Sequence, residues 1–140
     1  MLRTKTDYII VHSSATPSRM NIGVDEIRKW HLARGWSDVG YQFVIPRDGS
    51  IQHGRDRDAV GAHALGKNID SIGICLVGGV ADDGKTPEFN FTKFQLEALE
   101  DLLNDLLAVY YLAEVVGHRD VMPPGYTECP SFDVREWWAV

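Results

Sequence analysis

Residues 71–77 read SIGICLV, a run in which Ser71 is the one polar side chain. A strand that other elements cover on both faces shows a nearly continuous apolar run of this kind, whereas a strand with one exposed face alternates. The run therefore predicts the central strand of a sheet. Cys75 lies inside it, where a free thiol behaves as a small hydrophobic side chain, and we interpret it as part of the core.

The chain before this run shows strand and helix signals in turn. Residues 8–11 form a short apolar run of the strand type, and residues 42–46 and 50–53 flank an Asp48-Gly49 pair that indicates a hairpin. Between them, residues at helical spacing predict a helix that stops at Gly35. The positions that set this spacing are Val24, Ile27, Trp30 and Arg34.

The chain after residues 71–77 continues to alternate between helix and strand signals. Thr92 and Gln95 have the spacing of a capping box, and they precede a leucine stripe that predicts a helix with one apolar face. Val115-Val116 indicates a further short strand, and residues 133–138 indicate a last amphipathic turn or helix. We predict an α/β fold over residues 1–140 as a single domain, with a central mixed β-sheet flanked by helices.

Composition narrows the function classes. The chain has 140 residues with a hydrophobic fraction of 44%, enough for one core, and no apolar run long enough to span a membrane. Its net charge of −6 argues against non-specific binding to nucleic acid. The basic start is followed by too short an apolar run for a secretory signal, so we expect synthesis in the cytoplasm. Two cysteines cannot form a disulfide framework.

Three residues have the chemistry of a metal site. His12 and His118 each directly follow a predicted strand, and Cys129 comes after a loop stiffened by prolines. Two imidazoles and one thiolate form a known catalytic zinc set that leaves a fourth position open, and a thiolate disfavours magnesium and calcium. By spacing alone, ordinary core or surface side chains are favoured over a metal site.

The motifs along the chain resemble those of the type 2 N-acetylmuramoyl-L-alanine amidases. The resemblance runs in order through almost the whole chain, and it extends to short phage endolysins and to peptidoglycan recognition proteins. The matching segments are residues 9–16 (IIVHSSAT), 39–45 (VGYQFVI), 47–49 (RDG), 54–56 (GRD), 61–64 (GAHA), 71–74 (SIGI), 117–120 (GHRD) and 129–133 (CPSFD), together with Asn68.

The resemblance implies a mechanism and its residues. His12, His118 and Cys129 take the family's zinc-ligand positions, with one Zn²⁺ per chain, and Tyr41 takes the position of its catalytic tyrosine. The implied reaction is hydrolysis of the amide between the lactyl group of a peptidoglycan sugar and L-alanine. Two residues before the cysteine ligand, the phage endolysins of this group carry a lysine. This chain has Thr127 there, and several catalytic peptidoglycan recognition proteins also have a threonine. We expect Thr127 to be catalytic.

Three further residues are expected to contact substrate. His63 and Asn68 lie in a loop that the resemblance places beside the zinc, although a His and an Asn that stabilise a turn would fit the sequence equally well. Arg119 would assist the oxyanion in place of the missing lysine, or else form an ion pair with Asp120. His31 and His53 match no ligand position, and we interpret both as structural.

The resemblance and the lack of a signal suggest a phage or prophage endolysin that causes host lysis. It would be made in the host cytoplasm, act on bacterial peptidoglycan after membrane permeabilisation, and work as a monomer. Some phage members also bind the phage RNA polymerase, so that partner is a further expectation. One alternative is a cytoplasmic amidase that recycles muropeptides. The other is a non-catalytic peptidoglycan-binding module, and the presence of Cys129 counts against this second alternative.

Overall fold

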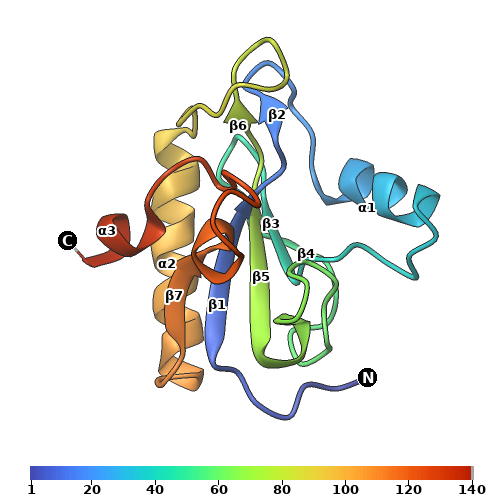
Figure 1. Ribbon diagram of the computed structural model, residues 1–140, viewed down its shortest axis with the longest axis vertical. Coiled ribbons are helices and arrows are strands. Elements are labelled where there is room, and N and C mark those ends of the chain that lie inside the picture. Colours follow the sequence, from blue (N-terminus) through green and yellow to red (C-terminus); the bar gives the residue numbers. More distant parts are fainter. Residues whose placement is uncertain (140) are drawn as a thin grey trace.

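The computed structural model describes residues 1–139, and the run quoted above forms strand β5 (Ser71–Leu76) at the middle of a five-stranded sheet (Figure 1). The strand order is β4-β3-β5-β1-β7. Strands β1 (Tyr8–Ser13), β3 (Phe43–Ile45), β5 and β7 (Glu114–Gly117) are parallel, and β4 (Gln52–His53) pairs antiparallel with β3. The predicted mixed sheet and its central strand are confirmed.

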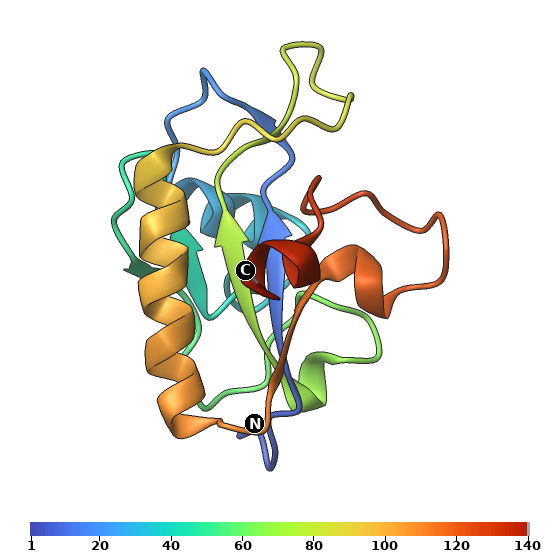
Figure 2. The ribbon, with the colours of Figure 1, turned by 90° about the vertical axis from the view of Figure 1, so that its left-hand side faces the viewer.

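Helices cover both faces of the sheet. On one face, α2 (Lys93–Val109) and α3 (Val134–Ala139) pack over the strands, as Figures 1 and 2 show, and Leu99 and Leu103 meet Ile9 and Val11 of β1 in the main core. On the other face, Ile27 of α1 (Val24–Ala33) packs against Val44 and Cys75. Because side chains alternate along a strand, His12 of β1 points away from the α2 face.

Local sequence signals explain the ends of the helices. The Thr92 side chain accepts a hydrogen bond from the Gln95 backbone N–H, and the Gln95 side chain accepts one from the Thr92 N–H, so the predicted capping box is present. Gly35, at φ +88°, follows the last turn of α1. The four positions that predicted α1 do not all lie on its buried face: Trp30 is 40% exposed, and His31 joins Ile27 there.

The structure adds short elements that the sequence did not indicate. Strands β2 (Thr16–Pro17) and β6 (Gly79–Val80) pair in parallel above the main sheet, and 3-10 turns η1 (Asn68–Asp70) and η2 (His118–Val121) follow the loop before β5 and strand β7. Within residues 1–139, none of the helices is long and apolar enough to cross a membrane. The carboxyl ends of β1, β5 and β7 meet at one edge of the sheet, and the site is built there.

Candidate metal centre and catalytic site

Strand pairing brings the two predicted histidine ligands together. In the parallel pair of β1 and β7, Val11 lies opposite Gly117, so that His12 and His118, the next residue of each segment, become neighbours. Their ring centroids are 4.4 Å apart. The ligand atoms of His12, His118 and Cys129 all lie within 4.8 Å of one another. The three residues therefore form one group of nitrogen and sulfur donors, a set that suits zinc.

Cys129 is held at this point by the end of β1. The Ser13 backbone N–H donates to the Cys129 Sγ at 3.1 Å, and Sγ lies 4.0 Å from His12 Nδ1. The Arg119 N–H donates to the Cys129 carbonyl at 2.9 Å, which ties the returning loop to η2. Burial raises the pKa of the Cys129 thiol to about 11, while the bonds from Ser13 favour the thiolate. A cation at the donor group would favour the thiolate further.

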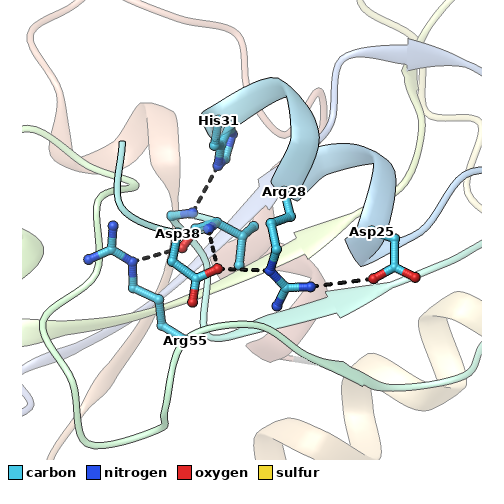
Figure 3. A network of polar contacts seen from close by, with 7 residues as sticks. Asp25, Arg28, His31, Asp38 and Arg55 are labelled. Atoms are coloured by element: carbon cyan, nitrogen blue, oxygen red, sulfur yellow. Dashed lines mark hydrogen bonds and ion pairs between the residues drawn. The ribbon is translucent and has the colours of Figure 1, made fainter. Parts of the chain in front are cut away.

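Tyr41 is delivered by the segment between α1 and β3, which a network of polar contacts holds (Figure 3). The Gly40 N–H donates to His31 Nδ1 at 2.8 Å, and Arg55 Nε donates to the Val39 carbonyl at 2.7 Å. Arg28 Nε donates to the Asp38 carboxylate at 2.8 Å. Contacts on both sides of the segment thus fix the backbone directly before Tyr41.

The Tyr41 ring lies beside the metal group. Its centroid is 5.1 Å from that of His12 and 5.6 Å from that of His31. Burial raises the pKa of the Tyr41 phenol well above its ordinary value, and the neighbouring Cys75 and Cys129 add to this effect. The phenol is therefore neutral near pH 7, and its O–H is a hydrogen-bond donor.

His63 and Asn68 occupy the loop before β5, and both line the pocket beside the metal group. The Asn68 side-chain oxygen accepts hydrogen bonds from the N–H groups of His63 at 2.8 Å and Ala64 at 2.9 Å, as a residue that stabilises a turn does. His63 Nδ1 lies 2.8 Å from His12 Nε2. Burial lowers the pKa of His63 to about 3, so its ring is neutral.

Thr127 lines a second pocket, of about 340 Å³, together with Ser13 and Cys129, and Arg119 belongs to η2. The Thr127 hydroxyl accepts a hydrogen bond from the Cys129 N–H at 3.0 Å, which leaves its own hydrogen free to be donated elsewhere. Arg119 faces Glu128 at 3.7 Å. The expected ion pair between Arg119 and Asp120 is wrong, because the Asp120 carboxylate accepts the Gly117 N–H at 2.8 Å at the start of η2.

A pocket of about 560 Å³ opens beside the metal group. Besides His12, Tyr41 and His63, its lining includes three residues for which no role in the site was predicted: Arg34, Trp36 and Tyr126. The Arg34 guanidinium lies 5.6 Å from the centre of the Trp36 ring. Arg34 at the C-terminal end of α1 and Trp36 in the loop that follows were the available signal, since loops often carry binding residues.

Comparisons with known proteins agree with this architecture. The family model described as N-acetylmuramoyl-L-alanine amidase matches residues 2–132. The endolysin of Klebsiella phage KP32 is 51% identical over 136 residues, which are 97% of this chain and 87% of that protein.

Two solved structures share the fold. The endolysin N-acetylmuramoyl-L-alanine amidase LysCS from Clostridium intestinale has a TM-score of 0.79 at 29% identity, over 100% of this chain and 89% of that chain. A variant of Drosophila PGRP-LB in complex with tracheal cytotoxin has a TM-score of 0.78 at 29% identity, over 99% of this chain and 83% of that chain. The predicted fold is confirmed by these similarities.

Proposed function

Because the chain belongs to the N-acetylmuramoyl-L-alanine amidase family, we propose that it is a zinc-dependent endolysin of a phage or prophage. Its substrate would be the amide bond between the lactyl group of a peptidoglycan sugar and L-alanine. The observation that carries the proposal is the convergence of the donor atoms of His12, His118 and Cys129 within 4.8 Å at the wall of an open pocket.

His12, His118 and Cys129 would hold the metal, and their two nitrogens and one sulfur match a catalytic zinc set with one position left for water or substrate. When bound, zinc supplies Lewis-acid polarisation of an amide carbonyl and makes a water molecule acidic enough to ionise near neutral pH. Ser13 would keep the Cys129 sulfur oriented, since its N–H already points at Sγ.

Tyr41 and Thr127 would support the negative charge that develops on the carbonyl oxygen. The neutral Tyr41 phenol is a donor at the wall of the pocket, and the position of its backbone is set before substrate arrives by the contacts of Val39 and Gly40. Donors that are oriented in advance stabilise a transition state without paying for reorganisation. Thr127 offers a hydroxyl hydrogen but no charge, so this chain would work without the lysine of related endolysins.

Arg34 and Trp36 line the pocket and offer it a cation and an aromatic ring. The net charge of the chain is −6, so an anionic wall polymer must be bound by local contacts of this kind rather than by overall attraction. We propose that the peptide stem of the substrate lies in this pocket. Asn68 would contribute by fixing the loop, and Arg119 by holding Cys129 through its backbone N–H.

The test combines zinc content with the release of new L-alanine amino termini from purified sacculi. The native protein should carry one zinc per chain and release amino groups, and Cys129→Ala should lose both. His53→Ala is the matched control, since it removes an imidazole from an exposed position outside the site and should change neither. A native protein without zinc, or with zinc and no release, would refute the proposal.

The same assay separates the alternatives. Release from soluble anhydro-muropeptides but not from sacculi would identify a recycling amidase, and binding to sacculi without release would identify a recognition module. Binding to a phage RNA polymerase stays a prediction, which a pull-down with the cognate polymerase would test.

A further inference from the structure

A chain of hydrogen bonds runs from His12 into the protein, on the side of the ring opposite Cys129. His12 Nε2 lies 2.8 Å from His63 Nδ1, and His63 Nε2 lies 3.2 Å from the Ser71 hydroxyl. The Ser71 hydroxyl donates to the Lys67 carbonyl at 2.6 Å. The segments that meet here are β1, the loop of residues 61–70, and the start of β5.

The Lys67 carbonyl, at the end of this series of hydrogen bonds, determines which group donates in each of them. A carbonyl oxygen only accepts, so the Ser71 hydroxyl donates its single hydrogen to the Lys67 carbonyl. The Ser71 oxygen then accepts from His63 Nε2–H. A neutral imidazole carries one hydrogen, which leaves His63 Nδ1 as an acceptor. His12 must therefore donate from Nε2–H. The lone pair of His12 then lies on Nδ1, the nitrogen 4.0 Å from the Cys129 Sγ.

The His63 ring is also held sterically, by two glycines. A Cβ atom on Gly73 would lie 2.5 Å from the His63 Cγ, and a Cβ atom on Gly61 would lie 2.7 Å from its Cδ2. Contacts below 3.0 Å require something to move. Gly73 interrupts the otherwise larger side chains of β5, and its missing side chain is the space in which the flat ring lies. The orientation of the ring is thus set by packing as well as by hydrogen bonds.

We propose that His63 is a positioning residue, which fixes His12 in the tautomer and ring orientation that a metal ligand needs. This inference rests on the proposed zinc site, and it replaces substrate contact as the main role of His63. A ligating histidine generally donates its second ring N–H to a fixed acceptor, and losing that acceptor commonly weakens metal binding about 10- to 100-fold. Here the acceptor is a second imidazole, which is itself oriented by Ser71.

The first test measures zinc affinity by competition with a chromogenic chelator. His63→Phe keeps a flat ring between the two glycines but removes both nitrogens, and zinc should bind about 10- to 100-fold more weakly. Gly73→Ala changes no polar group, yet it should weaken binding in the same direction by displacing the ring. His53→Phe is the matched control and should bind zinc like the native protein.

The second test reads the tautomers directly, by nitrogen-15 correlation spectra of the histidine rings in the metal-free native protein. We expect the hydrogen on Nε2 in both His12 and His63. A hydrogen on His63 Nδ1 would overturn the proposal, and this readout holds even if a variant fails to fold.

The outcomes separate this proposal from the proposed function. If the native protein binds no zinc, the zinc site itself is refuted. If the native protein and His63→Phe bind zinc equally tightly, the zinc site stands and only the positioning role of His63 is overturned.

Discussion

Acidification should weaken the fold through His31, whose imidazole must stay neutral to hold the segment that carries Tyr41. His31 is only 6% exposed, and its Nδ1 accepts the Gly40 N–H at 2.8 Å (Figure 3). Protonation would put a hydrogen on Nδ1, so that two donors would face each other. Burial, assisted by the charges of Arg34 and Arg55, lowers the pKa of His31 from 6.5 to about 4.

The size of the effect follows from linkage. Because the pKa is lower in the folded than in the unfolded state, the unfolded state binds more protons between these two values. The contribution of His31 is therefore complete above pH 6.5 and is lost as the pH falls through this window. At about 1.4 kcal/mol for each pH unit, the loss reaches about 3 kcal/mol by pH 4.

The assay compares the native protein with His31→Asn, whose side-chain oxygen can still accept from Gly40 but does not titrate. Urea unfolding is followed by tryptophan fluorescence at pH 7, 6, 5 and 4, with a chelator present so that metal loss contributes nothing. The variant should be less stable at pH 7, and its deficit relative to the native protein should shrink by about 3 kcal/mol towards pH 4. Other titrating groups, such as Asp38, cancel in this difference. Parallel curves for the two proteins would refute the reasoning.

Three further substitutions test the site and the core. Tyr41→Phe removes one donor and should lower kcat on sacculi by about 100- to 1000-fold with zinc content unchanged, and full activity would exclude the phenol from the reaction. Thr92→Ala removes the cap of α2 and should lower the free energy of unfolding by about 1 kcal/mol in urea, so an unchanged midpoint would show that the capping box contributes nothing. Leu103→Ala empties a fully buried position and should cost about 2 to 5 kcal/mol in the same measurement, whereas a cost below 1 kcal/mol would mean that the surrounding core collapses onto the space.

The elements that could be predicted are those whose signals are local. The capping box of Thr92 and Gln95 closes over four residues, and the run from Ser71 needs only its own apolar character to indicate a buried strand. Strand ends also carry information, because parallel strands place their carboxyl ends at one edge. His12 and His118 could therefore be expected to meet, and their register in the sheet brings them together.

The features that could not be predicted depend on distant partners. The spacing within α1 does not show that His31 rather than Trp30 is buried, because His31 accepts a hydrogen bond from Gly40, and nothing within the helix indicates that donor. Strands β2 and β6 have two residues each, too few for a periodic pattern. Arg119 turns to Glu128 because Asp120 is already engaged by the Gly117 N–H, a bond that exists only once η2 has formed.

Gly73 shows most clearly why a site can be recognised in a sequence before it can be explained. Within residues 71–77, a glycine looks like a weak point of a buried strand, since it costs conformational entropy and packs nothing itself. Its function becomes visible only when His63 is seen to occupy the space that a Cβ atom would fill. The metal ligands can be recognised from their residue types alone. The orientation of His63, in contrast, depends on the missing side chain of Gly73 in the neighbouring strand. A substitution as small as Gly73→Ala should therefore weaken metal binding although it changes no ligand.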